Sequence, residues 1–228
     1  MIGIIGAMAI EIEPLAAMMD NKTEETISGI TFTSGRIHGK DVVTAVCGVG
    51  KVFAAICAQT MIIRYSPDVI VNTGVAGAIS KKLHIGDVAV ANNVVQHDMD
   101  VRGLGYSLGF LCDLELTYIP CDEHAVSVIE KCLDSGGLNF LKGTIASGDQ
   151  FISDREKKDF IRENFDAVAC EMEGASIGHV CYVNKTPFSV IRAISDEADG
   201  GAGTDFPTFA KKAAENSLKT VSEFIKEF

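Results

Sequence analysis

The chain has 228 residues and a formal charge of −11 at pH 7, with 20 Lys and Arg residues against 31 Asp and Glu residues. Because nucleic acids and anionic membranes attract proteins through basic surfaces, this composition argues against a general nucleic-acid binder and a membrane-surface protein. Hydrophobic residues make up 47% and charged residues 22% of the chain, as in ordinary globular proteins.

The first half alternates runs of β-branched residues with segments of helical spacing, which is typical of a sheet covered by helices. In chain order it predicts a strand at 1–5, a helix at 9–19, a hairpin of strands at 30–37 and 42–47, a helix at 50–65, and strands at 69–73 and 88–95. Residues 96–120 are rich in glycine and show no period, which indicates a functional loop or lid.

The second half continues this alternation. It predicts a helix at 123–133, a strand at 141–147, a helix at 155–163, a strand at 167–170, a helix at 174–182, a strand at 188–195 and, after a glycine-rich loop at 200–203, an amphipathic helix at 206–228. No shift in composition and no internal repeat divides the chain. We therefore expect one α/β domain over residues 1–228.

Neither a run of about 18 apolar residues nor a basic N-terminal region occurs, so we expect no membrane span, no signal peptide and a cytoplasmic protein. The seven cysteines are odd in number and include no C-x-x-C pair, which favours reduced thiols in the core. The five histidines lack metal-binding spacing, and we expect no metal.

Glycine motifs do not complete a nucleotide-binding signature. Gly48-Val49-Gly50-Lys51 resembles the end of a phosphate loop, but Ala45 and Val52 stand where that motif needs glycine and a hydroxyl residue. The dinucleotide pattern fails as well, at Phe53. What remains is a set of glycines at strand ends, where ligands of open α/β sheets bind.

Acidic residues at strand ends are more informative. Glu11, Glu173 and Asp196 each follow a predicted strand closely. Each could instead be an ordinary charge at a helix start or a loop cap. Together, a pair of carboxyl groups suits cleavage of a glycosidic bond, in which one protonates the leaving group and the other activates the nucleophile.

Motifs along essentially the whole chain resemble the bacterial 5′-methylthioadenosine/S-adenosylhomocysteine nucleosidases. They are Gly6-Ala7-Met8 with Glu11, Asn72-Thr73-Gly74-x-Ala76-Gly77, His97-Asp98-x-Asp100-Val101 with Gly105-Tyr106, Ser147-Gly148-Asp149-x-Phe151-Ile152, Glu171-Met172-Glu173, and Arg192-Ala193-Ile194-Ser195-Asp196. The resemblance implies a three-layer nucleoside phosphorylase fold with a central twisted mixed sheet surrounded by helices. It also implies a homodimer that hydrolyses the N-glycosidic bond to adenine and a 5-thioribose without a cofactor.

The resemblance also assigns roles to residues. It implies that Glu11 activates water, Asp196 protonates adenine N7 and Glu173 binds the ribose hydroxyls. For the base, it implies that Phe151 stacks on adenine and Ile152 reads the base edge. It implies that Met172 packs on the ribose, Arg192 holds the water and Ser195 orients Asp196. The residues implied to line the pocket are Met8, Val49, Val75 and Phe206. Glu13 competes with Glu11 for the role of base.

Departures from the family pattern leave the substrate range open. Val75 stands where serine is common, and Leu104 and Cys112 stand where phenylalanine and proline are common. By resemblance, Val101 and Leu104 belong to a loop that covers the 5′ substituent in the neighbouring subunit. The substrates then include methylthioadenosine, S-adenosylhomocysteine and 5′-deoxyadenosine, with futalosine or a related nucleoside as an alternative.

Two other functions compete. A phosphorolytic purine nucleoside phosphorylase needs basic residues to bind phosphate, whereas the first loop carries Glu11 and the turn after residue 71 carries Asn72. A nucleoside-binding sensor without activity could dispense with Glu11 or Asp196, and both are present. We therefore expect a hydrolase in methionine salvage and in recycling of S-adenosylmethionine by-products.

Overall fold

The computed structural model describes residues 1–228 and has a mixed sheet at its centre. Its strands are β1 (Ile2–Gly6), β2 (Asp20–Ile27), β3 (Ile30–Ile37), β4 (Lys40–Val46), β5 (Val69–Ala78), β6 (Val88–Gln96), β7 (Ile119–Pro120), β8 (Phe140–Ser147), β9 (Ala167–Glu171) and β10 (Phe188–Asp196). The sheet runs in the order β10-β6-β8-β9-β5-β1-β4-β3-β2, and β7 pairs with β6. This arrangement confirms the predicted α/β fold.

Strand β5 organises the sheet. It pairs in parallel with β1 and β10 and, near its end, antiparallel with β9. In addition, β10 pairs with β6, and β8 joins β6 to β9. The strands β5, β10, β6, β8 and β9 therefore form a closed circuit of pairings. All residues of β5 and β10 are buried, as expected of continuous apolar strands covered on both faces.

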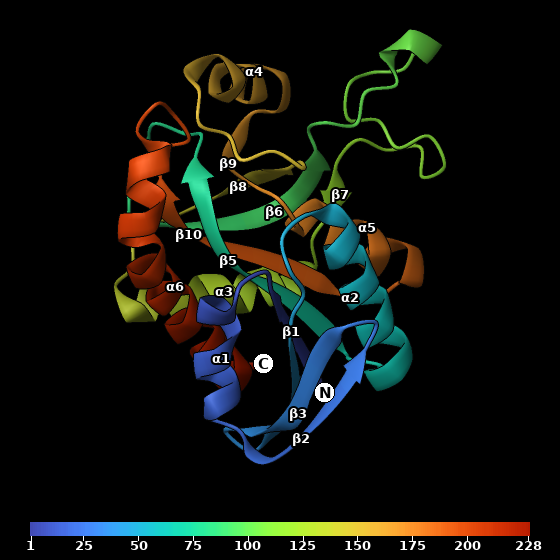
Figure 1. The fold of residues 1–228 in the computed structure, drawn as a ribbon, viewed down its shortest axis with the longest axis vertical. Helices are drawn as coiled ribbons and strands as arrows, with labels where there is room; N and C mark the ends of the chain where they lie inside the picture. The colour runs from blue at the N-terminus through green and yellow to red at the C-terminus, as the bar shows by residue number, and fades with distance from the viewer.

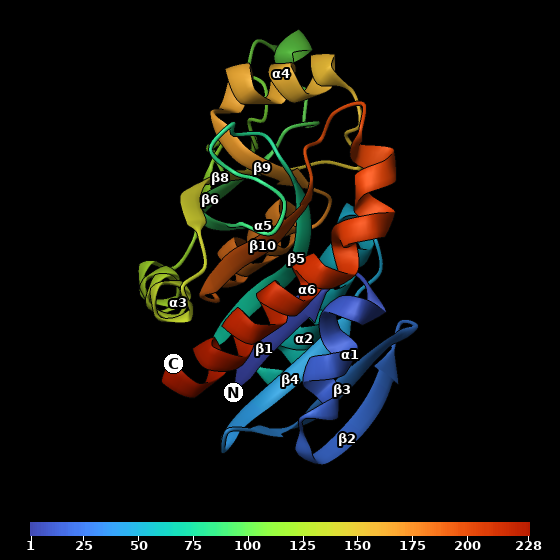
Figure 2. The same cartoon turned by 90° about the vertical axis from the view of Figure 1, so that its left-hand side faces the viewer.

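Helices cover the sheet on two sides. They are α1 (Ala9–Ala17), α2 (Lys51–Tyr65), α3 (Glu123–Gly136), α4 (Arg155–Phe165), α5 (Gly174–Asn184) and α6 (Ala202–Glu227). Figure 1 shows α1 and α6 together on one side of the sheet and α2 with α5 on the other. Figure 2 shows α6 running diagonally across β5 and β10, which it contacts. No helix is both long and apolar enough to cross a membrane.

Several elements differ from the sequence prediction. Strand β2 was not predicted, β5 continues past residue 73 to Ala78, and α6 begins at Ala202 inside the segment predicted as a glycine-rich loop. The irregular segment 96–120 holds a short 3₁₀ helix at Arg102–Leu104 and the strand β7, and it projects from the body of the molecule (green in Figure 1). All seven cysteines are unpaired, and all but the half-buried Cys112 are buried. A single domain over residues 1–228 stays a prediction.

Candidate active site

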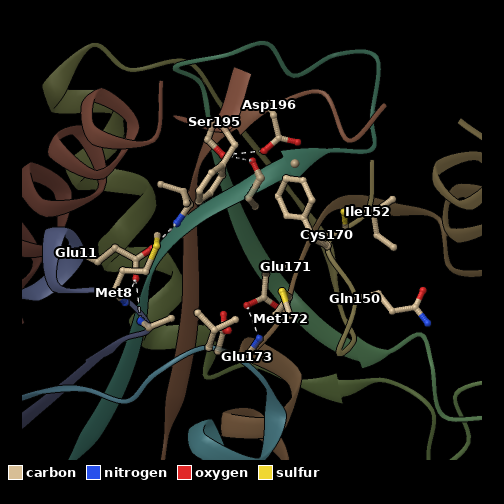
Figure 3. Close-up of a pocket in the computed structure, with 17 residues that line it drawn as sticks. Met8, Glu11, Gln150, Ile152, Cys170, Glu171, Met172, Glu173, Ser195 and Asp196 are labelled. Carbon is tan, nitrogen blue, oxygen red and sulfur yellow. Dashed lines mark hydrogen bonds between the residues drawn. The ribbon is translucent and has the colours of Figure 1, made fainter. Parts of the chain in front are cut away.

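A pocket of about 340 Å³ opens where β1, β5, β9 and β10 end. Figure 3 shows carboxylates on its different sides, with Glu11 beside Met8, Asp196 beside Ser195, and Glu173 near Met172. All but one of the residues predicted for the substrate site line it, namely Met8, Glu11, Val49, Val75, Phe151, Ile152, Met172, Glu173, Ser195, Asp196 and Phe206. Long-range folding therefore brings together residues that the chain separates by almost 200 positions.

Glu11 lies in the first turn of α1 and is only 3% exposed. Its Oε2 accepts hydrogen bonds from the backbone N–H groups of Ala7 (2.8 Å) and Met8 (2.9 Å), and its Oε1 accepts one from Val75 (3.2 Å). Burial raises the pKa of this carboxyl, while the charge of Arg192 and the three N–H donors oppose that rise. The carboxylate is thus held in one orientation with an increased affinity for a proton.

The close approach of β5 to Glu11 requires glycine at position 74. A Cβ atom there would lie 2.7 Å from Glu11 Oε1, well inside van der Waals contact. The glycine motif at residues 72–77 was expected to allow close approach of a ligand to the backbone. Its Gly74 instead leaves room for the side chain of Glu11.

Arg192 is the predicted residue that does not line the pocket. Its side chain is buried behind the pocket wall and donates to the backbone oxygens of Asn72 (3.1 Å) and Ile191 (3.0 Å), to the Asn72 side chain and to Glu171. Burial alone would lower the pKa of Arg192, but the charges of Glu171, Glu173 and Glu11 raise it. Arg192 therefore affects the pocket through its charge, which lowers the pKa of Glu11, and its role in holding water stays a prediction.

Glu173 immediately precedes α5 and lines the pocket. Its Oε1 accepts a hydrogen bond from the backbone N–H of Gly50 (2.8 Å) at the start of α2. Burial, followed by the charge of Glu171, raises the pKa of Glu173 to about 7. A carboxyl group with one oxygen fixed in this way leaves the other free to accept from a ligand hydroxyl.

Asp196 ends β10 and is 2% exposed. Its Oδ2 accepts from Ser195 Oγ (2.9 Å) and its Oδ1 from the backbone N–H of Ala198 (2.9 Å). Burial raises the pKa of Asp196 against these two hydrogen bonds. A raised proton affinity is what an acid needs, and the Ser195 hydroxyl binds one oxygen of Asp196.

Aromatic side chains form one wall of the pocket. The rings of Phe151 and Phe206 meet edge to face, with centroids 5.6 Å apart and an interplanar angle of 77°. Such a wall suits a planar ligand such as a purine. Val101 and Leu104 lie outside this pocket, on or beside the short 3₁₀ helix of the projecting loop, and Leu104 is 75% exposed.

Some lining residues had no predicted role, namely Ala7, Ala76, Gly77, Gln150, Cys170 and Glu171. Glu171 is the most important of them because it receives hydrogen bonds from Ser147, Arg192 and the N–H groups of Glu173 (3.0 Å) and Gly174 (2.8 Å). The sequence signal for Glu171 was its place in the Glu171-Met172-Glu173 motif. Ala7, Ala76 and Gly77 also belong to the quoted motifs, Gln150 occupies the variable position before Phe151, and Cys170 was predicted to be a core thiol.

The sequence profile of the phosphorylase superfamily matches residues 1–226. The chain therefore belongs to the phosphorylase superfamily. Within it, the chain is 40% identical over 228 residues to the 5′-methylthioadenosine/S-adenosylhomocysteine nucleosidase of Shewanella halifaxensis, and the match covers 99% of each protein.

The chain is also similar to solved structures of such enzymes. The crystal structure of the 5′-methylthioadenosine/S-adenosylhomocysteine nucleosidase from Neisseria meningitidis, in complex with methylthio-immucillin-A, matches with a TM-score of 0.97 at 36% identity and covers 100% of this chain and 99% of that one. The native structure of a futalosine hydrolase from Helicobacter pylori matches with a TM-score of 0.96 at 35% identity, covering 100% and 97%. The resemblance seen in the sequence motifs is confirmed.

Proposed function

We propose that this chain hydrolyses the N-glycosidic bonds of 5′-methylthioadenosine and S-adenosylhomocysteine, releasing adenine and a 5-thio-substituted ribose. The observation that carries the proposal is the convergence of two buried carboxyl groups with raised pKa values, Glu11 and Asp196, on one pocket with an aromatic wall. The named relatives support the choice of substrates.

In the proposed reaction, water attacks the anomeric carbon while the bond from that carbon to the purine nitrogen breaks. Glu11 accepts a proton from the water, and Asp196 gives a proton to N7 of the departing adenine, whose ring receives the bonding electron pair. After the products leave, Glu11 gives its proton to solvent and Asp196 takes one up, so both groups return to their starting states. Each carboxyl group thus has a separate task.

Other pocket residues would hold the substrate. In this proposal Phe151 stacks on the adenine, the backbone of Ile152 reads the base edge and Met172 packs on the ribose. The free oxygen of Glu173 accepts hydrogen bonds from the ribose hydroxyls, and Phe206 closes the pocket over the ligand. These roles need no metal or organic cofactor.

The geometry supports water over phosphate as the nucleophile. The N–H groups of Ala7, Met8 and Val75, which could bind an anion, already donate to Glu11. No lining residue is basic, and the guanidinium of Arg192 is occupied by Glu171 and Asn72. A phosphate dianion would therefore meet the Glu11 carboxylate without a partner to neutralise it.

Adenine release tests the proposal. The protein should release adenine from methylthioadenosine in phosphate-free buffer at a rate that added phosphate does not increase, as measured by chromatography of the products. Release that depends on phosphate would identify a phosphorylase. Tight binding without release in either buffer would identify a nucleoside sensor.

Substrate range is the second part of this assay. We propose that 5′-deoxyadenosine is also cleaved, because the groups that contact the base and ribose are independent of the 5′ substituent. Futalosine is the alternative substrate, which the likeness to the futalosine hydrolase from Helicobacter pylori favours. Comparing the kcat/KM values of methylthioadenosine, S-adenosylhomocysteine, 5′-deoxyadenosine and futalosine ranks these candidates.

We further propose a cytoplasmic homodimer of one-domain subunits that serves methionine salvage and the recycling of S-adenosylmethionine by-products. Support for the dimer comes from α2, whose side chains Val52, Phe53, Ile56 and Ile63 are exposed although they are apolar. Leu104 and Val101, on the projecting loop, would then cover the 5′ end of the substrate in the partner subunit.

A charged residue on α2 should separate the subunits. Val52 is 69% exposed, so Val52→Glu should fold normally yet shift the sedimentation coefficient from dimer to monomer and lower turnover. Lys211→Glu on the exposed face of α6 is the matched control and should remain dimeric. A monomeric wild-type protein would contradict the dimer without affecting the proposed reaction.

A further inference from the structure

Three charged residues outside the pocket lining form a closed ring. Asp149 Oδ1 accepts a hydrogen bond from the backbone N–H of Lys51 (2.7 Å), and the backbone N–H of Asp149 donates to Asp98 Oδ2 (3.0 Å). The ammonium group of Lys51 closes the ring by donating to Asp98 Oδ1 (2.6 Å). The ring joins the start of α2 to the loops that follow β6 and β8.

Two members of this ring, Asp149 and Lys51, are next in sequence to residues of the site. Asp149 precedes Gln150, Phe151 and Ile152, which line the pocket and include the proposed purine wall. Lys51 follows Gly50, whose N–H fixes one oxygen of Glu173. The ring therefore connects the loop that carries Phe151, proposed to bind the base, with the turn that holds Glu173, proposed to bind the ribose.

The start of α2 has little other means of fixing its position. Its capping residue, Gly50, has no side chain and a φ of 99°, so the first N–H groups of the helix are bound by carboxylates from elsewhere in the chain, those of Glu173 and Asp149. Ser176 Oγ also donates to the backbone oxygen of Lys51 (2.7 Å), which ties α5 to the same turn. Losing the Asp149 side chain would thus break the direct link between this turn and the purine loop, while Glu173 and Ser176 still hold the turn.

The ion pair in the ring is better protected than an ordinary surface pair. The side chains of Lys51 and Asp98 are each 20% exposed, and Lys51 also donates to Gln96 Oε1 (3.3 Å). Burial alone would raise the pKa of Asp98, but its bonds with Lys51 and the Asp149 N–H lower it. Partial burial and two backbone partners make this network stronger than an isolated exposed pair.

We propose that Lys51, Asp98 and Asp149 are positioning residues that set the purine wall relative to the ribose-binding carboxylate. The inference rests on the proposed function, because it takes Phe151 and Glu173 as the groups that hold the substrate. The ring touches neither the reacting carbon nor the proposed acid and base, so its loss should weaken binding far more than turnover.

Asp149→Ala tests this inference. With methylthioadenosine, the variant should show a KM about tenfold above wild type, equivalent to about 1.4 kcal/mol, with kcat within about threefold. The inhibition constant of adenine should rise as well, because the purine loop loses its bond to the start of α2. Asp149→Asn keeps an oxygen that can cap α2 and should recover most of the affinity. Lys51→Met leaves that cap in place and should raise KM by about threefold.

Asp122→Ala is the matched control. Asp122 caps α3 by the same kind of bond, in which its Oδ1 accepts from the backbone N–H of Ala125 (2.8 Å), but it does not line the pocket. It should lower the melting temperature and leave KM unchanged. An equal rise of KM in Asp122→Ala, or KM values within twofold of wild type in both Asp149→Ala and Lys51→Met, would overturn the inference. A wild-type protein that releases no adenine would instead overturn the proposed function, and the inference with it.

Discussion

Replacing Glu11 with glutamine should lower kcat for adenine release by about 10³-fold and change KM by no more than a few-fold. The proposed base must take a proton from water as the glycosidic bond breaks, and an amide cannot do so at neutral pH. Substrate contacts are made by other residues, so affinity is preserved. Steady-state and single-turnover rates with methylthioadenosine provide the measurement.

The surroundings of Glu11 predict a second consequence of the same change. Three backbone N–H groups point at this side chain, so the amide nitrogen of glutamine must face at least one donor. A loss of stability of about 1–3 kcal/mol is expected, and rates should be compared well below the melting temperature of the variant. Activity retained within tenfold of wild type would rule out Glu11 as the base.

Glu13 offers the matched control. By sequence, Glu13 competes with Glu11 for the role of base, but in the structure the Glu13 side chain is exposed and does not line the pocket. Glu13→Gln should therefore keep wild-type kcat and stability. If Glu13→Gln were the inactive variant instead, the assignment of the base would be reversed.

The pH dependence follows from the direction of the Glu11 pKa. A base must be ionised to act, and burial raises the pKa of Glu11 above that of an exposed glutamate. Activity of the wild-type protein should fall as the pH is lowered through this raised pKa. Residual activity of Glu11→Gln should lack that acidic limb in a profile of kcat against pH.

Most of the fold could be predicted because its central strands are continuous apolar runs. Strands β5 and β10 are buried at every residue, and runs of that kind leave a clear signal. Strand β2 leaves none, since residues 20–24 are all exposed and the strand pairs only with β3 at the edge of the sheet. The extension of β5 was hidden by Gly74 and Gly77, which are rare in strand interiors.

The site was predictable where a residue follows an apolar strand within a recognised motif. Glu11, Glu173 and Asp196 met that condition, and the structure brings all three to one pocket. The direction in which Arg192 points could not be inferred, because alternate residues of a strand face opposite sides and β10 is buried on both.

The ring of Lys51, Asp98 and Asp149 shows a different limit. Its members are separated by 47 and 51 positions, and each bond joins a side chain to a distant loop or helix start. No local periodicity predicts such a pairing. Lys51 in particular has the pattern of an ordinary residue in the first turn of a helix, so its contacts emerge only when the sheet brings the ends of β6 and β8 together.

Asp196→Asn should lower kcat by about 10²–10⁴-fold while leaving KM for methylthioadenosine near the wild-type value. Asparagine has the same shape, and its single oxygen can still accept from the Ala198 N–H while its NH2 donates to Ser195 Oγ, because a hydroxyl can also accept. Its amide group can bind N7 of adenine but cannot transfer a proton to it. Binding is therefore preserved, and only the step in which charge develops on the leaving base is lost.

Proton transfer also fixes the sign of the pH effect. An acid must be protonated to act, and burial raises the pKa of Asp196, so activity of the wild-type protein should fall as the pH rises through that pKa. In Asp196→Asn this alkaline limb should disappear. Glu197→Gln, at the exposed next position, is the control and should keep both the rate and the limb. Near-normal turnover in Asp196→Asn would show that adenine leaves without its help, and the proton would then have to reach N7 from solvent.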